Sequence, residues 1–505
     1  MKAFLMHPGQ DFELEQDPPP WSADLARDLE LGALLNAMAG GDKFLFDVAQ
    51  RALLRGLTDP AAIRYRQDIL ADCLTSPTVV REMYNLAVTV VEGERKVFFG
   101  LFFRDSPDVI LHRSVQVLEF FTGHLRTLRK LADEHAGNFH SAGVTRLFGM
   151  LTEELSDEYF TEIDRHLATL KFRRGVLISA GLGTGNKGIR YVLRKPREQG
   201  WLERLSPGGR DGYSFAIADR DENGMRAVAD LEGHGTKLVA NALAQSCDHI
   251  LSFFRLLRAE LAFYIGCLNL HGLLTGMGQP VRYPDPRPGG EPALSAQGLY
   301  DPALALQTRG RVVANDLQAD GKSLIMITGA NQGGKSTFLR SLGLAQLMMQ
   351  CGMFTCAQSY QADVSQRVFA HYKREEDASM KSGKLDEELA RMSGIVDRIT
   401  PGSLLLCNES FASTNEREGS EIAGQIVRAL LDRGIKVVFV THMFDLAQRF
   451  HQQNLDGVLF LRAGRQADGG RTFRISAANP LPTSHGGDVY QRIFAADLDH
   501  SAALG

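Results

Sequence analysis

The nine residues GANQGGKST (329–337) constrain the fold of this chain more than any other stretch. They fit the pattern GxxxxGK[ST], follow the apolar run SLIMIT (323–328) and precede the amphipathic segment STFLRSLGLAQLMMQ. A glycine-rich turn between a buried strand and a helix N-terminus forms a cradle of backbone N–H groups for phosphate. The sequence therefore predicts an α/β domain of the P-loop nucleoside triphosphatase class.

Each residue type in this loop suits one part of nucleotide binding. Gly333 and Gly334 let the backbone turn around phosphate oxygens, Lys335 reaches the β and γ oxygens, and the Ser336 hydroxyl is a ligand for Mg²⁺. The predicted nucleotide contacts in the loop are Gly329, Asn331, Gly333, Gly334, Lys335, Ser336 and Thr337. ATP and Mg²⁺ are the expected cofactors.

A second apolar run, SLLLCN (403–408), predicts a strand buried on both faces that ends in a polar pair. Nucleoside triphosphatases usually end this strand in Asp-Glu, but here the pair is Asn408-Glu409. The Asn408 amide oxygen can accept from a water on Mg²⁺ but carries no charge, whereas Glu409 can polarise an attacking water. We expect a slow Mg²⁺-dependent ATPase, because losing such a metal partner weakens metal binding or activity.

A third apolar run, IKVVFV (435–440), leads to His442. The imidazole could sense a γ-phosphate, or His442 could simply start the next helix, and the sequence leaves both readings open. The candidate catalytic residues are thus Lys335, Glu409 and His442, and the candidate metal ligands are Ser336 and Asn408.

These segments resemble the ATPase domain of the MutS family of DNA mismatch repair proteins. The stretches that carry the resemblance are LIMITGANQGGKSTFLRSLGLAQLMMQCGMFTCA, SLLLCNESFASTNEREG, VFVTHMFDLAQ, GLYDPAL (298–304), Asn315-Asp316 and SHGGDVYQRIF (484–494). The resemblance is strong over 290–495 and rests on architecture alone upstream. It implies a MutS-like parallel sheet of the ABC type, a homodimer that changes shape on binding ATP, and contact with DNA.

Three features depart from the family pattern. Asn408 replaces the aspartate. The N-terminal part shows no Phe-x-Glu wedge signature and is short, so we expect it to hold no mismatch-reading domain. The third departure is EEDASMKSGKLDEELARM (375–392), where Lys-Leu-Asp replaces the family's Ser-Thr-Phe. In the family this loop caps the partner's γ-phosphate, so the resemblance makes Ser382 and Gly383 candidate nucleotide contacts. The segment equally suits a charged helix start.

The expected domain boundary lies in the Pro- and Gly-rich stretch TGMGQPVRYPDPRPGGEP (275–292). Residues 1–285 should form a mainly helical core and lever region, and residues 286–505 the ATPase domain. Val115, Leu118, Phe121, Leu125 and Leu128 recur at helical spacing in the first part. A β-rich insertion (171–225) should hold two strands around the turn GLGTGNKG, and a third strand with a turn in GYSFAIADRDENG. The resemblance makes this insertion a much reduced clamp.

The insertion is locally basic in a chain of net charge −4. Its first part holds the cations Lys171, Arg173, Arg174, Lys187, Arg190, Arg194, Lys195, Arg197 and Arg204, with the aromatics Phe172, Tyr191 and Trp201 between them. This pattern suits contact with a nucleic-acid backbone, and it equally suits a solvated basic face.

Composition excludes several classes of protein. The hydrophobic share of 44% and charged share of 23% are those of a soluble globular protein, and no apolar run could span a membrane. Six cysteines without a CxxC pair indicate reduced thiols in the cytoplasm. We expect ATP-gated engagement of DNA without mismatch specificity. The alternative is a nucleotide-switched protein-interaction scaffold that binds no DNA.

Overall fold

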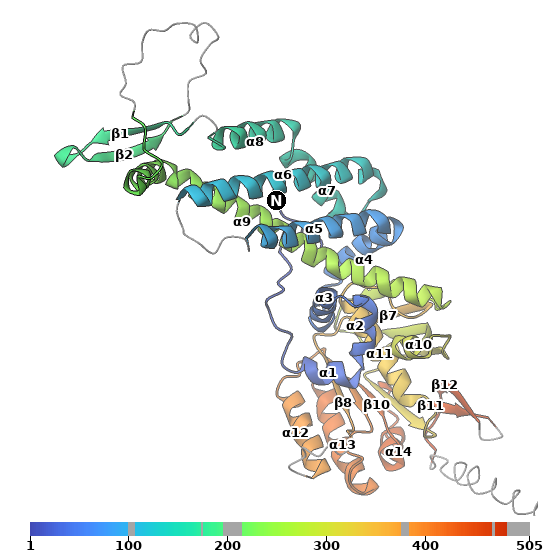
Figure 1. Ribbon diagram of the computed structural model, residues 1–505. Coiled ribbons are helices and arrows are strands. Elements are labelled where there is room, and N and C mark those ends of the chain that lie inside the picture. Colours follow the sequence, from blue (N-terminus) through green and yellow to red (C-terminus); the bar gives the residue numbers. More distant parts are fainter. Residues whose placement is uncertain (99–106, 173–174, 195–214, 375–382, 467–469, 482–505) are drawn as a thin grey trace, which may run out of the picture. The chain divides into compact units, whose positions relative to one another are not determined.

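The computed structural model describes residues 1–98, 107–172, 175–194, 215–374, 383–466 and 470–481 (Figure 1). The chain forms two compact units. Unit 1 comprises Met1–Ala3, Thr78–Phe139 and Val144–Arg258, and unit 2 comprises Phe4–Pro77, His140–Gly143 and Ala259–Gly505. The 55-residue helix α9 (Glu222–Gly276) belongs to both units.

Unit 1 is helical, with one β-hairpin. Its elements are α5 (Pro77–Phe98), α6 (Pro107–His135), α7 (Ala142–Glu154), α8 (Asp157–Leu170), β1 (Ile178–Leu182), β2 (Gly188–Leu193) and the first part of α9. The five apolar residues predicted on one helix face, Val115 to Leu128, are all buried in α6. Side chains of α6, α8 and α9 form one core cluster, which includes Val115, Leu118 and Leu167.

The hairpin confirms the two predicted strands and the glycine-rich turn between them, since β1 and β2 pair antiparallel. The further strand expected in GYSFAIADRDENG is wrong for its described part, because residues 215–221 contain no strand. Phe215 is 82% exposed there, so no packed sheet face holds this segment extended.

Unit 2 surrounds two sheets with helices. The helices are α1 (Ser22–Asp28), α2 (Leu31–Ala39), α3 (Lys43–Leu54), α4 (Pro60–Thr75), α10 (Pro302–Thr308), α11 (Lys335–Gln350), α12 (Lys384–Val396), α13 (Glu416–Asp432) and α14 (Phe444–Gln452). The smaller sheet has the order β3-β7-β4-β5 and consists of β3 (Asp285–Arg287), β4 (Leu294–Leu299), β5 (Asn315–Gln318) and β7 (Ser359–Asp363).

The larger sheet positions the site. Its order is β12-β11-β6-β10-β9-β8, and its strands are β6 (Leu324–Gly329), β8 (Val368–Tyr372), β9 (Leu404–Asn408), β10 (Lys436–Val440), β11 (Val458–Arg465) and β12 (Arg471–Ala477). All neighbouring pairs are parallel except β11 with β12. The predicted strands at 323–328, 403–408 and 435–440, and the largely parallel sheet, are therefore confirmed.

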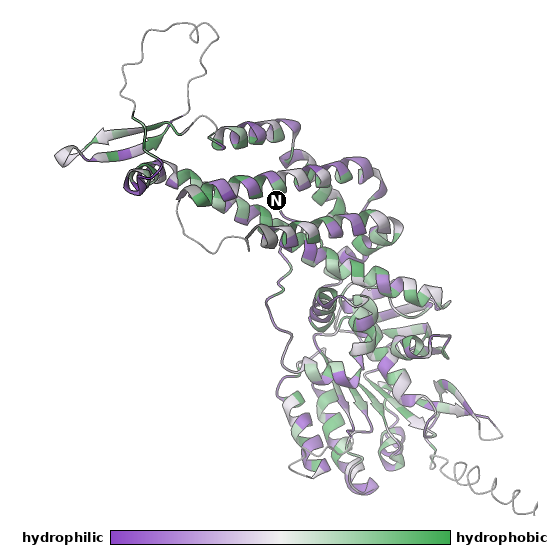
Figure 2. Ribbon diagram, viewed as in Figure 1, coloured by the Kyte–Doolittle hydropathy of each residue, from purple (hydrophilic) through white to green (hydrophobic). Residues whose placement is uncertain are grey.

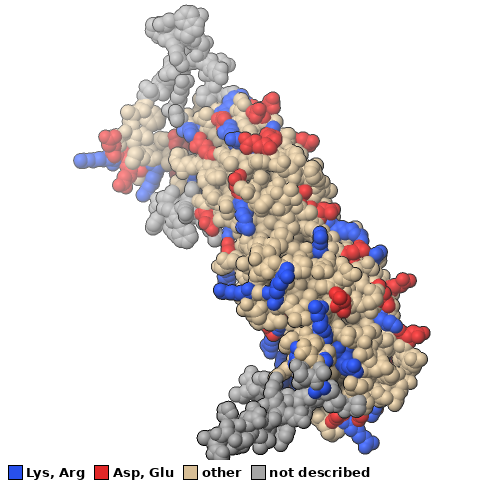
Figure 3. Space-filling view, turned by 90° about the vertical axis from the view of Figure 1, so that its right-hand side faces the viewer, with Lys and Arg blue, Asp and Glu red and all other residues tan. Residues whose placement is uncertain are grey.

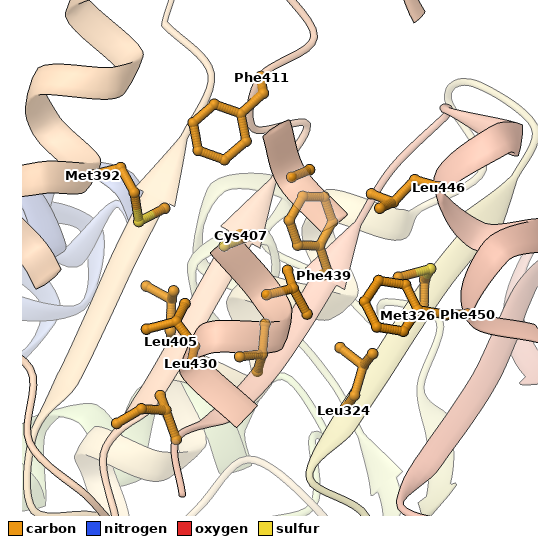
Figure 4. Packing of buried hydrophobic residues seen from close by; sticks show 14 of the residues in the cluster. Leu324, Met326, Met392, Leu405, Cys407, Phe411, Leu430, Phe439, Leu446 and Phe450 are labelled. Carbon is orange, nitrogen blue, oxygen red and sulfur yellow. The ribbon is translucent and has the colours of Figure 1, made fainter. Parts of the chain in front are cut away.

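Strands β6, β9 and β10 are buried on both faces, which explains why their sequences are continuously apolar rather than alternating. One face packs on α13 and α14 and the other on α11 (Figure 1). Figure 4 shows side chains from the strands and from α13 and α14 meeting in one cluster, including Leu324, Met326, Leu405, Cys407, Phe439, Leu430, Leu446 and Phe450. Figure 2 shows the same strands as predominantly hydrophobic.

Two buried ionisable side chains hold the N-terminal segment within unit 2. The Glu260 carboxylate accepts from the backbone N–H groups of Leu5 and Phe12, and burial raises the pKa of Glu260 to about 7. Arg66 donates to the carbonyl oxygens of Met6 and Cys351 at 2.6 and 3.2 Å. Residues near the chain start are thereby tied to the C-terminal end of α11.

All six cysteines are free thiols. Five of them are buried, and only Cys247 is partly exposed. Across the described ranges, no helix is both long enough and apolar enough to span a bilayer. Lysine and arginine side chains are interspersed with acidic ones on the face drawn in Figure 3.

Candidate functional site

The loop between β6 and α11 reverses the chain in a conformation that its glycines permit. Gly334 precedes the first residue of α11 with a φ of 90°, in the region where side chains are strained. Gly329 has a φ of 106°, and a Cβ there would lie 2.9 Å from the backbone nitrogen of Ala463 on β11. The loop therefore presents the N-terminus of α11, where helix N–H groups lack intrahelical partners.

Lys335 is the first residue of α11, and its side chain folds back over the loop. Its Nζ donates to the carbonyl oxygens of Gly329 and Ala330 at 2.9 and 3.0 Å. The side chain is buried, and burial lowers the pKa of Lys335 while the nearby Glu409 carboxylate opposes that shift. A buried ammonium whose hydrogen bonds go to neutral carbonyls favours a further anion beside it.

Ser336 and Asn408 meet across the sheet edge. The Ser336 Oγ donates to Asn408 Oδ1 at 2.9 Å, so the amide oxygen at the end of β9 fixes the serine hydroxyl. The hydroxyl proton is used in this bond, which leaves the oxygen lone pairs of Ser336 available to a cation. Within the described ranges, no group of three or more His, Cys, Asp or Glu residues could hold a metal.

Glu409 follows β9 in a left-handed conformation, with a φ of 53°, and its backbone N–H donates to Val440 O at 2.8 Å. His442 lies between β10 and α14, with its Nδ1 3.7 Å from Glu409 Oε1. The imidazole of His442 holds the pKa of the Glu409 carboxyl below its usual value, against the opposing effect of burial. Glu409 is thus a carboxylate that stays ionised beside the loop.

Lys335, Ser336 and Glu409 border one cavity of about 680 Å³, whose lining does not include Asn408 or His442. Its floor is the loop and the first turns of α11, with Asn331, Gly333, Gly334, Lys335, Ser336, Thr337 and Glu409. Its mainly apolar wall includes Leu299, Tyr300, Leu304, Val312, Val313, Phe338 and Phe473. A polar floor and an apolar wall suit a ligand with a charged end and an aromatic end.

The apolar wall was not predicted from the sequence. In the sequence, GLYDPAL (298–304) and Asn315 are recognisable only as counterparts of family segments, and Phe473 stands in no motif. Asn315 holds Phe473 in place: its Nδ2 donates to Phe473 O at 3.3 Å and its Oδ1 accepts from Ile475 N at 2.7 Å. These bonds join β5 to β12 across two sheets, so the pattern of neither segment alone predicts the wall.

Some predicted residues do not line the cavity, and others lie outside the described residues. Gly329 ends β6 and Gly383 is the N-cap of α12, and neither lines the cavity. Ser382 lies outside the described residues, as do Arg173, Arg174, Lys195, Arg197, Trp201, Arg204 and 484–494. Arg190 and Arg194 are exposed on the hairpin, and Arg194 Nε donates to Ser179 Oγ at 2.9 Å.

Two family models match the chain. The MutS2 N-terminal domain matches residues 58–277, and MutS domain V matches residues 325–473. The second range contains the loop, Asn408, Glu409 and His442, and neither matched model is a mismatch-recognition domain.

Curated relatives match over shorter stretches. A DNA mismatch repair protein MutS of Thermotoga sp. (strain RQ2) is 35% identical over 159 residues, 31% of this chain and 20% of that protein. An Endonuclease MutS2 of Thermus thermophilus is 33% identical over 135 residues, 26% of this chain and 18% of that protein. A MutS of Chloroflexus aurantiacus is 26% identical over 249 residues, 46% and 26% of the two chains. The chain therefore spans about a quarter or less of these relatives, and by its two matched domains and its relatives it belongs to the MutS family.

Proposed function

We propose that this chain is a P-loop ATPase that binds ATP with Mg²⁺ in the cavity above α11 and hydrolyses it slowly. The observation that supports this most is the convergence of Lys335, Ser336, Asn408 and Glu409 at the carboxyl ends of β6 and β9. Ligands of parallel α/β sheets bind at that edge. In the proposal the polar floor takes the triphosphate and the apolar wall takes the nucleoside.

Phosphate binding falls to Lys335 and the backbone of the loop. The ammonium, which donates to two loop carbonyls, exchanges these neutral acceptors for charged phosphate oxygens, and charge-assisted bonds are the stronger ones. The free N–H groups at the start of α11 contribute further donors and a favourable helix dipole.

Ser336 and Asn408 fit a Mg²⁺ site of modest strength. The Ser336 oxygen would be a direct ligand, and the Asn408 amide would orient that hydroxyl or a metal-bound water. When bound, Mg²⁺ neutralises charge on the phosphate oxygens. Because Asn408 is uncharged, this chain holds the cation with one negative charge fewer than an aspartate would supply, which favours slow turnover.

Glu409 is the residue that polarises the attacking water. Its pKa is lowered beside His442, so it is ionised at neutral pH but is a weak base. His442 orients the Glu409 carboxylate and can approach a γ-phosphate from the same side. The weak basicity of Glu409 and its orientation by His442 together support slow ATP hydrolysis rather than an inactive site.

We further propose that ATP gates engagement of DNA without mismatch specificity, in a cytoplasmic homodimer. Residues 286–505 would carry the ATPase site, completed by Ser382 and Gly383 of a second copy, and residues 1–285 the arm. The exposed cations Lys187, Arg190 and Arg194 on the hairpin of unit 1 support contact with a phosphate backbone.

The alternative is a nucleotide-switched scaffold for another protein. It is favoured by apolar side chains on the same hairpin, since Leu182 is 79% exposed and Val192 is 44% exposed. If the protein is a scaffold, replacing both residues with serine should abolish capture of the partner protein. If it binds DNA through the hairpin cations, the same replacement should leave its affinity for DNA unchanged.

The test of the proposed function is phosphate release and filter binding with one preparation. We expect ATP-dependent phosphate release in the parent, none in Glu409→Gln, and ATP-sensitive retention of duplex, branched or single-stranded DNA. A parent that binds ATP but releases no phosphate would overturn the enzymatic part. Absence of DNA retention at low salt, with hydrolysis intact, would favour the scaffold.

A further inference from the structure

The loop that follows Glu409 adopts an unusual backbone conformation. Glu409 and Phe411 have φ values of 53° and 64°, both in the left-handed region that residues with a Cβ rarely occupy. Such conformations persist only where surrounding contacts impose them. The direction of the Glu409 carboxylate therefore depends on what holds residues 410–413.

The first anchor is His371, at the end of β8. Its Nδ1 lies 2.7 Å from Ser410 Oγ, and its ring stacks on Phe411 with the centroids 5.5 Å apart. The side chains of His371, Ser410 and Phe411 are all fully buried. The residue directly after Glu409 is thus bonded to the neighbouring strand.

The second anchor is α12. His371 Nε2 lies 3.0 Å from the Glu388 carbonyl oxygen, so Nε2 carries the ring proton and donates to α12. Burial lowers the pKa of His371 to about 4, so the ring is neutral and its Nδ1 is an acceptor. The Ser410 hydroxyl lies 2.7 Å from both this Nδ1 and the His371 carbonyl oxygen, to which it donates, so His371 holds Ser410 by ring and backbone together. The Glu388 side chain closes the loop from α12, since its Oε1 accepts from Ser413 Oγ at 3.0 Å.

Helix α12 is itself firmly held on the sheet. Arg391 Nη1 donates to Tyr372 O at 2.8 Å, and Arg391 Nη2 donates to Asp28 Oδ2 of α1 at 3.1 Å. Glu388, one turn earlier on this helix, is 5% exposed. Its other carboxylate oxygen is buried and has no hydrogen-bond partner among the described residues. One oxygen of Glu388 therefore binds the loop. Burial raises the pKa of the Glu388 carboxyl, against the opposing effects of Ser413 and the Phe411 backbone.

We propose that Glu388 and His371 are positioning residues for Glu409, which they hold in its left-handed conformation through Ser413 and Ser410. This inference rests on the proposed ATP hydrolysis, in which Glu409 polarises water. Neither residue lines the nucleotide cavity, so their loss should slow the chemical step and leave nucleotide binding unchanged. The Glu388 side chain acts as a hydrogen-bond acceptor, so a neutral amide can replace it.

The experiment compares Glu388→Ala, Glu388→Gln and the control Glu387→Gln on the same helix. For each variant, kcat and KM of phosphate release, the affinity for a fluorescent ATP analogue and the Tm are measured. We expect Glu388→Ala to lower kcat about 10–100-fold, as misplacement of a reacting group by about 1 Å does, with KM and analogue affinity unchanged. Glu388→Gln and Glu387→Gln should keep kcat near that of the parent, whatever small change the Tm shows.

A double-mutant cycle with Ser413→Ala adds a second readout. Because Ser413 and Glu388 share one bond, the double variant should lose no more activity than Glu388→Ala alone. An unchanged kcat in Glu388→Ala, or a kcat in Glu388→Gln as low as in Glu388→Ala, would overturn the positioning role. So would a loss of analogue affinity that matches the loss of kcat.

The parent and Glu409→Gln separate this inference from the proposed function. If the parent hydrolyses ATP and Glu409→Gln does not, the proposed function stands and the Glu388 variants test positioning alone. If the parent releases no phosphate, both the proposed function and the positioning role are overturned.

Discussion

Ser336 Oγ donates to Asn408 Oδ1 over 2.9 Å, from the first turn of α11 to the end of β9. An aspartate at residue 408 would accept the same bond with a charged oxygen. The asparagine thus keeps the orientation of the serine hydroxyl and removes only the negative charge, which separates the geometric contribution of this position from the electrostatic one.

Restoring a negative charge at residue 408 tests whether its electrostatic contribution is distinct from its geometric one. Asn408→Asp should lower the Mg²⁺ concentration needed for half-maximal phosphate release and raise the rate by about 10-fold or more, because carboxylates near the metal retain the cation. Asn408→Ala removes the bond to Ser336 and should need more Mg²⁺ than the parent. Equal Mg²⁺ dependence in all three proteins would show that residue 408 has no part in binding the cation.

Removing the ammonium of Lys335 should abolish most nucleotide affinity. Lys335→Met keeps the aliphatic stem but loses the charge-assisted bonds to phosphate, and we expect binding about 10–100-fold weaker by isothermal titration. The Tm without nucleotide should not fall, because burial of the ammonium already disfavours its charged form. Lys43→Met, an exposed lysine on α3, is the matched control and should bind like the parent.

The pair of Glu409 and His442 predicts a specific pH dependence. His442 depresses the pKa of Glu409 in the folded protein, so the carboxylate stays ionised as pH falls below its ordinary value of 4.5. The stability gained from this ionisation is present above the unfolded pKa and is lost as pH falls through the folded pKa. In His442→Ala the pKa of Glu409 should rise, which shifts the acid limb of the kcat profile to higher pH. An unshifted limb would mean that His442 does not control this carboxylate.

Charge reversal on the hairpin tests the proposal that this chain binds DNA. Arg190→Glu with Arg194→Glu should weaken binding equally across sequences and reduce the slope of log affinity against log salt by about 1 per lost phosphate contact. Lys130→Glu, an exposed reversal on α6 of the same unit, controls for net charge. If the affinity for DNA, measured by filter binding, is unchanged in the hairpin variant but lowered in the control, the DNA contact lies outside the hairpin.

Buried Glu260 should make the free energy of unfolding fall as pH rises, in contrast to the contribution of Glu409. Its folded pKa of about 7 exceeds the ordinary 4.5, so the folded state binds the extra proton and stability falls as pH rises through this window. Glu260→Gln, which cannot ionise, should therefore have a higher Tm than the parent at pH 8. The difference should shrink or reverse at pH 5, and a difference that does not vary with pH would contradict a protonated Glu260.

The elements that the sequence predicts best are those whose pattern is local. The apolar runs that became β6, β9 and β10 and the glycine turn before α11 each carry their signal within ten residues, and the structure has them at the predicted positions. Lys335, Ser336, Asn408 and Glu409 also converge as expected, because parallel strands bring their carboxyl ends to one edge.

The features that were missed depend on contacts between distant segments. The apolar wall requires Phe473 of β12 to be held by Asn315 of β5, and the anchoring of Glu409 requires His371, Ser410 and Glu388 to meet. In the sequence, nothing distinguishes His371 and Ser410 from ordinary buried polar residues. The prediction of a strand near Phe215 was wrong for the opposite reason. The local sequence suits a strand, but residues 215–221 pair with no neighbouring strand.

The distribution of thiols makes this chain well suited to spectroscopic labelling. Five of the six cysteines are buried, and burial raises their thiol pKa values, so they would react slowly with maleimides. A single change, Cys247→Ser, would remove the remaining accessible thiol. Paired probes on Lys130 of α6 and Lys43 of α3, each replaced by cysteine, would then follow the separation between units 1 and 2 through a complete nucleotide cycle without disturbing the core.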